Sequence, residues 1–173
     1  MAASASSAVV ESGALPAAAA PTSWEQLAGF GVDIPFVRLL GFVLTQLSGG
    51  QSEITYTAQP EHLNSFGVTH GGALMTLLDV SMATAARSES PHQGVVTIEM
   101  KTSFMHPAVG PLLARGALVH RTATMAFTQS TIFDSQGRAC ASAMGTFKYL
   151  KPSPSSAPAL AGVEHAASSA ATR

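Results

Sequence analysis

The chain has 173 residues, a net charge of −1 and only 11% charged residues, where roughly a quarter is usual in soluble proteins. It has no cluster of Lys and Arg and no apolar run of about 18 residues, so we expect neither a nucleic-acid partner nor a membrane span. Its single cysteine, Cys140, excludes an intramolecular disulfide and fits a reducing compartment, so we expect a cytoplasmic protein. So few charges on a small domain also favour an oligomer.

Composition divides the chain into three parts. Residues 1–22 and 152–173 consist mostly of Ala, Ser and Pro and carry few charges. They lack the large apolar side chains whose burial offsets ordering entropy, so both are predicted to be disordered tails. Residues 23–151 remain as one folded domain.

The first half of this domain predicts a hairpin and then a buried helix. Residues 24–40 suggest a short helix and a connecting turn. Two β-prone runs, 41–48 and 51–59, flank a Gly-Gly pair, which is typical of a hairpin. After a loop, residues 71–88 carry apolar side chains on nearly every face of a helix, so this helix is predicted to be buried on most sides.

The second half predicts four strands, at 93–104, 111–122, 125–134 and 138–150. The connections between them are short, which predicts that successive strands are antiparallel neighbours. One antiparallel sheet wrapped around one helix is the economical way to bury that helix. The expected fold class is therefore α+β.

Several common catalytic and cofactor motifs are absent from the sequence. It contains no nucleophile elbow, no Walker loop, no dinucleotide-binding glycine pattern and no His-Glu-x-x-His. The six histidines show no metal-ligand spacing, so we expect no metal. Cys140 has no base beside it in sequence and is interpreted as a small apolar filler in a strand.

Asp79 is the unusual residue of the predicted helix. It is the only charged residue between Glu61 and Arg87, and it lies between Leu78 and Val80. An interior carboxylate is costly unless it is paired or hydrogen-bonded, and no opposite charge lies three or four residues away on this helix. Asp79 is therefore a candidate general base or nucleophile. The alternative is a carboxylate that reaches water or bonds to a neighbouring loop.

A second candidate element precedes the helix, with Asn64 six residues before His70, Gly71 and Gly72. Backbone N–H groups at a helix start lie at the positive end of the helix dipole, and glycine has no Cβ to block a ligand oxygen. This pattern suits an oxyanion hole for a carbonyl that becomes tetrahedral. The alternative is that the glycines only permit a tight turn into the helix.

The spacing of these two elements predicts a site shared between subunits. Asp79 is eight residues beyond Gly71, which places the two about 12 Å apart along one helix. An Asp side chain does not span that distance. If both residues act on one carbonyl, Gly71 and Asp79 must come from two antiparallel helices of a dimer.

The sequence from Asn64 to Asp79 (NSFGVTHGGALMTLLD) resembles the helix signature of hot-dog fold acyl-CoA thioesterases of the phenylacetate-degradation (PaaI-like) type. The strand at 95–104, the turn at 105–108 and the strand end at 145–148 are similar to the same family. The resemblance covers 36–150. It implies an antiparallel sheet of five or six strands around a central helix, in a homodimer that usually assembles into a homotetramer.

The resemblance also implies roles for individual residues. The Gly71 amide would polarise the thioester carbonyl, Asp79 of the other subunit would be the nucleophile or the base, and Thr97 would position the attacking water. Asn64, His70 and Gly72 would bind the substrate. No metal or resident cofactor is implied, because coenzyme A arrives as part of the acyl-CoA.

Each lesser residue also has a structural interpretation. Thr97 fits a strand by propensity alone, the His70 ring suits a bond to backbone, and Asn64 suits a brace for the turn. Lys148, Lys151 and Arg121 suit either the coenzyme A phosphates or plain solvation.

Three functions compete at this point. The first is hydrolysis of an acyl- or aryl-CoA thioester. The second is dehydration or hydration of an acyl thioester, which would need a His with an acidic partner over the β-carbon. The third is a non-catalytic acyl-CoA sensor that uses the same pocket. A histidine followed by Gly-Gly, with the carboxylate on the helix, favours hydrolysis, and the sequence does not specify the acyl group.

Overall fold

The computed structural model describes residues 29–30 and 33–151, and the predicted tails at 1–22 and 152–173 lie outside them. The elements are α2 (Pro35–Leu40), β1 (Val43–Ser48), β2 (Gln51–Thr57), the 3-10 turn η1 (Pro60–His62), α3 (Gly71–Ser88), β3 (Val95–Phe104), β4 (Pro111–Arg121), β5 (Met125–Asp134) and β6 (Ala139–Tyr149). The helix predicted at 71–88 has these bounds in the structure. The predicted strands differ from the observed ones by at most two residues at an end.

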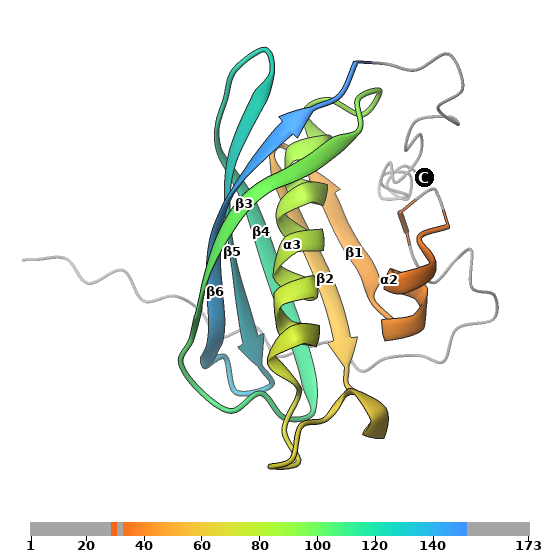
Figure 1. Ribbon diagram of the computed structural model, residues 1–173, viewed down its shortest axis with the longest axis vertical. Coiled ribbons are helices and arrows are strands. Elements are labelled where there is room, and N and C mark those ends of the chain that lie inside the picture. Colours follow the sequence, from red (N-terminus) through yellow and green to blue (C-terminus); the bar gives the residue numbers. More distant parts are fainter. Residues whose placement is uncertain (1–28, 31–32, 152–173) are drawn as a thin grey trace, which may run out of the picture.

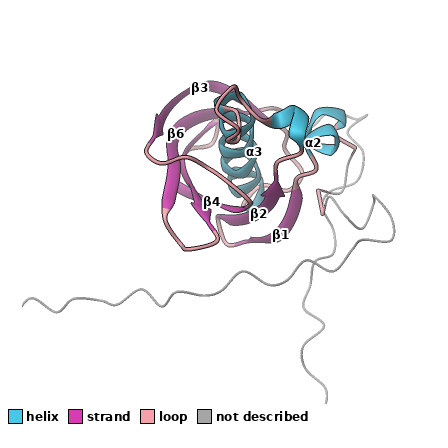
Figure 2. Ribbon diagram, turned by 90° about the horizontal axis from the view of Figure 1, so that it is seen from below, coloured by secondary structure: helices cyan, strands magenta, loops and turns pink. Residues whose placement is uncertain are grey.

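The six strands form one sheet in the order β1-β2-β4-β5-β6-β3, and every neighbouring pair is antiparallel. The sheet curves around α3, which lies in its hollow (Figures 1 and 2). Leu77, Leu78 and Met82 of α3 are fully buried against it. This confirms the α+β arrangement of one sheet around one helix.

One predicted strand pairing is wrong. The runs that became β3 and β4 were expected to be neighbours, but β3 pairs with β6, while β4 lies between β2 and β5. The segment between them passes the start of α3, where the Thr69 N–H donates to the Ala108 carbonyl at 3.0 Å. The Met105 N–H donates to the Cys140 carbonyl on β6 at 2.8 Å. A connection anchored at both places crosses the end of the sheet and leaves β3 as an edge strand.

Buried polar contacts hold α3 against the sheet. The Ser52 hydroxyl of β2 donates to the Ser81 carbonyl at 2.7 Å, and the hydroxyls of Ser81 and Ser130 lie 2.6 Å apart. The Tyr149 hydroxyl of β6 donates to the Ala86 carbonyl at 3.0 Å. Apolar packing has little directionality, whereas hydrogen bonds require defined distances and angles. These three contacts therefore fix the rotation and the axial position of the helix.

Gly116 of β4 permits this close approach. A Cβ built at this position would lie 2.6 Å from the Ser52 hydroxyl and closer still to the Ser81 carbonyl. No side chain fits there unless α3 moves. The absence of a Cβ at Gly116 is thus part of what places the middle of the helix.

We expect Gly116→Ala to lower the free energy of unfolding by about 1–3 kcal/mol, the usual cost of overpacking a core. Gly94→Ala is the matched control, because its Cβ would meet Leu150 at an ordinary 3.4 Å. Its effect should stay within about 0.5 kcal/mol. Urea unfolding measures both, and equal midpoints for the two variants would contradict the close-approach argument.

Candidate active site

In the first turn of α3, one of the two glycine N–H groups has no hydrogen-bond acceptor in the described part of the chain. His70 is the N-cap, and its Nδ1 accepts a hydrogen bond from the Gly72 N–H at 2.9 Å. The Gly72 amide is therefore not free for a ligand, because the His70 ring caps it, which is the bond to backbone that the structural interpretation of His70 expected. The Gly71 N–H has no acceptor within the described part of the chain. The amide at Gly71 remains available to a ligand.

The bond to Gly72 also assigns the tautomer of His70. A nitrogen that accepts a hydrogen bond carries no proton, so the neutral ring holds its proton on Nε2. The backbone N–H of His70 donates to the His62 carbonyl at 2.8 Å. The bond from Gly72 thus orients the exposed ring, while the preceding turn holds the His70 backbone.

Asn64 braces the loop before the helix. Its side-chain carbonyl accepts hydrogen bonds from the N–H groups of Phe66 at 2.9 Å and Val68 at 3.4 Å. This is the structural interpretation given to Asn64 above, and it applies to the oxygen of the side chain. The side-chain amide nitrogen has no acceptor among the described residues, and Asn64 lines the pocket that also contains Gly71.

A surface pocket of about 350 Å³ connects these residues. Its walls come from the 64–69 loop, the start of α3 and the 104–108 turn. Its lining includes the apolar side chains of Leu74, Phe104 and Met105, together with Asn64 and Gly71. Asp79 is not part of this pocket.

Asp79 and Thr97 form a second cluster. The Thr97 hydroxyl donates to Asp79 Oδ1 at 2.7 Å. Burial raises the pKa of the half-buried Asp79 above its ordinary value, and the bond from Thr97 acts in the opposite direction. No ion pair to Asp79 exists among the residues that the structure describes. An unpaired carboxylate held by one hydroxyl can act as a base.

A β-bulge in β3 lets two of its residues, Thr97 and Phe104, both face α3. Thr97 pairs with Phe147 and Glu99 pairs with Thr146, which leaves Ile98 as an extra residue. Side chains alternate along a strand, so an extra residue reverses the alternation beyond it. Thr97 before the bulge and Phe104 after it therefore both point to the helix, although Phe104 is seven positions further along the strand and a regular alternation would place the two on opposite faces. Phe104 lies 3.4 Å from where a Cβ on Gly71 would stand.

Within one chain, the clusters remain separate. The structure brings Asn64, His70 and Gly71 together, and it brings Asp79 to Thr97. The two groups lie on the same helix about 12 Å apart along its axis. Exposed or half-buried residues run along the side of α3 that carries Asp79: Gly72, Met75, Asp79, Ala83 and Arg87. We call this stripe the open face of α3.

The edge strand beside the open face is also exposed. Val96, Ile98 and Phe104 of β3 have 40%, 54% and 55% of their surface accessible. The outer edge of β3 has no neighbouring strand, and an exposed strand edge with apolar side chains favours pairing with another chain. An apolar strand edge is therefore exposed beside the open face of α3.

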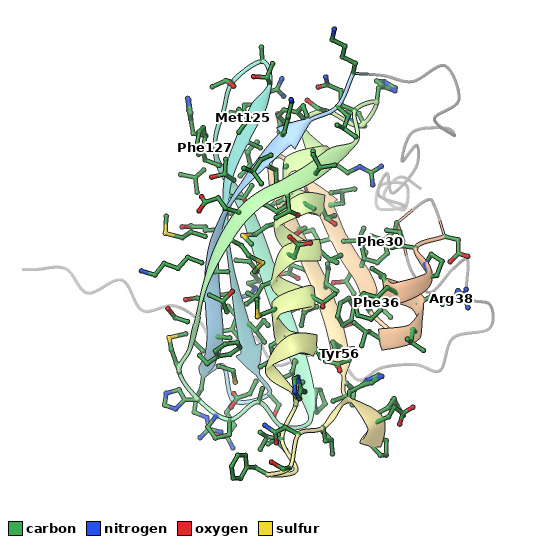
Figure 3. All side chains as sticks on the ribbon, viewed as in Figure 1. Phe30, Phe36, Arg38, Tyr56, Met125 and Phe127 are labelled. Atoms are coloured by element: carbon green, nitrogen blue, oxygen red, sulfur yellow. The ribbon has the colours of Figure 1, made fainter. Side chains whose placement is uncertain are left out.

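Two features near the site were not predicted from sequence. Tyr56 of β2, labelled in Figure 3, forms a buried pair with His62, and its hydroxyl lies 3.1 Å from His62 Nδ1. Burial raises the pKa of Tyr56 to about 12, so it remains a neutral donor at physiological pH. Because the His62 carbonyl holds the His70 N–H, this pair supports the start of α3 from behind. The second feature is the bulge at Ile98.

Two further properties of the described residues concern metal sites and membrane-spanning helices. No group of three His, Cys, Asp or Glu side chains within residues 29–30 and 33–151 has a metal-binding arrangement. No helix in the described part of the chain is both long and apolar enough to cross a membrane.

Comparison with known proteins identifies the family. The model of the thioesterase superfamily matches residues 66–141, which include the start of α3, Asp79 and Thr97. A Pseudomonas aeruginosa protein named "Putative esterase PA0474" is 34% identical over 117 residues, or 65% of this chain and 87% of that protein. The chain belongs to the thioesterase superfamily.

Solved structures of the superfamily share the fold. A Ralstonia eutropha JMP134 protein, described as a "putative thioesterase, phenylacetic acid degradation-related protein", is 25% identical with a TM-score of 0.63 over 68% of this chain and 92% of its own. The Escherichia coli PaaI protein from the phenylacetic acid degradation operon is 21% identical with a TM-score of 0.66 over 69% of this chain and 87% of its own. This last likeness concerns the hot-dog fold alone.

The bond between Thr97 and Asp79 gives a test that is independent of activity. We expect Thr97→Val to raise the pKa of the Asp79 carboxyl further, because it removes the hydroxyl that stabilises the anion and leaves burial unopposed. Thr146→Val is the matched control, since Thr146 donates at 2.9 Å to a different carboxylate, Glu99. Carboxyl ¹³C shifts followed through a pH titration report the Asp79 pKa, and no change in Thr97→Val would refute the coupling.

Proposed function

We propose that this thioesterase-superfamily protein hydrolyses acyl-CoA or aryl-CoA thioesters to the free acid and coenzyme A. The observation that supports this most directly is the pair of complementary half-sites on α3. One is an unclaimed amide at Gly71, and the other is the half-buried carboxylate of Asp79 with Thr97 as its only hydrogen-bond partner within the described residues.

In the proposed reaction, the Gly71 N–H of one subunit donates to the thioester oxygen. Its hydrogen bond and the positive end of the helix dipole stabilise the negative charge that develops on that oxygen. Asp79 of the other subunit acts either by taking a proton from an attacking water or by attacking the carbonyl carbon itself. Both routes break the C–S bond, and the coenzyme A thiolate leaves and is then protonated. On the second route the acyl group remains on Asp79 as a mixed anhydride, which water then hydrolyses to the free acid and the restored carboxylate.

The other residues have supporting roles in this proposal. Thr97 holds the Asp79 carboxylate, and its hydroxyl oxygen keeps lone pairs that can accept from the attacking water. His70 caps the helix and keeps the Gly71 amide in place, and Asn64 offers its amide N–H groups to the substrate. No resident cofactor is needed, because coenzyme A is part of the substrate.

The minimal active unit in this proposal is a homodimer with antiparallel α3 helices. The separation of Gly71 and Asp79 supports it, and so do the exposed edge strand β3 and the open face beside it. The dehydratase alternative is less favoured, because the Nδ1 of His70 is used by Gly72 and no described carboxylate bonds to the ring. Such a reaction would need that carboxylate as a partner.

We expect Asp79→Asn to lower kcat by about 100-fold or more, since it removes the base and keeps the shape. Affinity for a non-hydrolysable acyl-CoA analogue should persist, because the charge acts mainly in the transition state. Burial raises the pKa of Asp79, so the anion costs stability once the pH exceeds its ordinary carboxyl range. The Asn variant should therefore melt no lower than the parent at neutral pH, and near-normal turnover would remove Asp79 from the mechanism.

The shared site predicts complementation between two inactive variants. Asp79→Ala lacks the carboxylate, and Gly71→Val places a bulky side chain beside the amide and against Phe104. A mixed dimer holds one site with both groups intact, so mixing the two variants should restore part of the activity. Thiol release from an acyl-CoA measures it. If labelled subunits exchange and no activity returns, the two-subunit site is wrong.

A further inference from the structure

Arg87 is a half-buried cation with no counter-charge in the described chain. It lies in the last turn of α3, and its Nε is buried without a hydrogen-bond partner. None of the ion pairs among residues 29–30 and 33–151 includes it. Burial lowers the pKa of Arg87 from its ordinary value, and no neighbouring carboxylate opposes that effect. A cation in this condition favours any anion that reaches it.

Its position within the helix does not account for the burial. A basic side chain in the last turn interacts favourably with the helix dipole, but a fully hydrated side chain obtains the same benefit. The other described arginines with ion pairs are more exposed, as Arg38, Arg115 and Arg138 have 52%, 54% and 60% of their side-chain surface accessible. Arg87 is thus the arginine that is both partly buried and unpaired in the described chain.

The location of Arg87 links it to the proposed reaction. It lies on the open face of α3, eight residues beyond Asp79, with Ala83 between them. Side chains on a helix lean toward its N-terminus, which directs a long side chain at position 87 toward the Ala83 turn. Ala83 is small and half-buried, so no long side chain stands at the one position of this stripe between Asp79 and Arg87.

We propose that Arg87 binds an anionic group of the substrate and thereby holds the thioester over Asp79. The proposal rests on the acyl-CoA hydrolysis proposed above. A guanidinium suits oxyanions because it offers several N–H donors in a fixed plane. Two parts of an acyl-CoA carry such oxygens: the phosphates of coenzyme A in every substrate, and a terminal carboxylate in dicarboxylic acyl groups.

Substrate pairs separate the two sources. Butyryl-CoA and succinyl-CoA differ in the terminal carboxylate, while butyryl-CoA and butyryl-pantetheine differ in the phosphates. Arg87→Gln should raise KM about 10- to 100-fold for substrates that carry the bound anion and leave kcat nearly unchanged. Arg87→Lys should recover part of the loss, because it restores the charge without the planar donors.

Each result decides the proposal. A KM increase for both CoA esters and not for the pantetheine ester assigns the phosphates, and an increase for succinyl-CoA alone assigns the acyl carboxylate. The control is Arg115→Gln on the sheet, which removes an arginine paired with Glu53 and should leave every KM unchanged. Unchanged KM values for all three substrates in Arg87→Gln would overturn the proposal. So would unchanged KM values with a dimer that dissociates more readily, since Arg87 would then pair with the other subunit.

Equilibrium binding keeps this test apart from the test of the proposed function. If the parent protein hydrolyses none of the esters but binds butyryl-CoA or succinyl-CoA, and Arg87→Gln weakens that binding, hydrolysis fails and the role of Arg87 stands. If the parent protein binds none of the three esters, both proposals fail.

Discussion

The 2.6 Å contact between the buried hydroxyls of Ser81 and Ser130, together with the bond from Ser52 to the Ser81 carbonyl, sets the position of the central helix. An apolar helix in an apolar hollow could slide or rotate at little cost, because burial alone is not directional. These bonds and the missing Cβ of Gly116 leave α3 one position. Asp79 lies two residues before Ser81, so the rotation fixed in the core also determines that the carboxylate faces Thr97 and the open face.

The sheet contributes a second constraint through its edge strand. Without the extra residue at Ile98, either Thr97 or Phe104 would point away from the helix. With it, one strand supplies both the hydroxyl that holds Asp79 and an apolar wall of the pocket at Gly71. The bulge thus allows a single strand to contact both the Asp79 cluster and the pocket at Gly71, which lie about two helical turns apart along α3. It also disrupts the edge locally, which limits how a second chain can pair there.

Local patterns in the sequence were sufficient for the elements, for Gly71 and for Asp79, whereas Thr97 was implied only by the family resemblance. The helix at 71–88 could be predicted because its apolar residues repeat with a helical period, and Asp79 stood out because it interrupts them. The pairing of β3 could not be predicted, because the hydrogen bonds of Ala108 and Cys140 that redirect the connection are made by backbone groups and have no side-chain signature. A bond from the His70 ring to backbone could be expected from the sequence, but its partner, the Gly72 N–H, could not, because that depends on how the ring is turned at the helix start.

The open face of α3 shows why the charges of the site stay uncompensated within the chain. Asp79 and Arg87 have opposite signs but are eight residues apart, beyond the three- or four-residue spacing at which helix side chains pair. Position 83 is four residues from each of them. A basic residue there would pair with Asp79 and lower its pKa, and an acidic residue would pair with Arg87. Ala83 does neither, so the carboxylate keeps a pKa raised by burial and the guanidinium keeps its donors. The same small side chain also places no bulk between the two charges, as the proposed contact of one substrate with both requires.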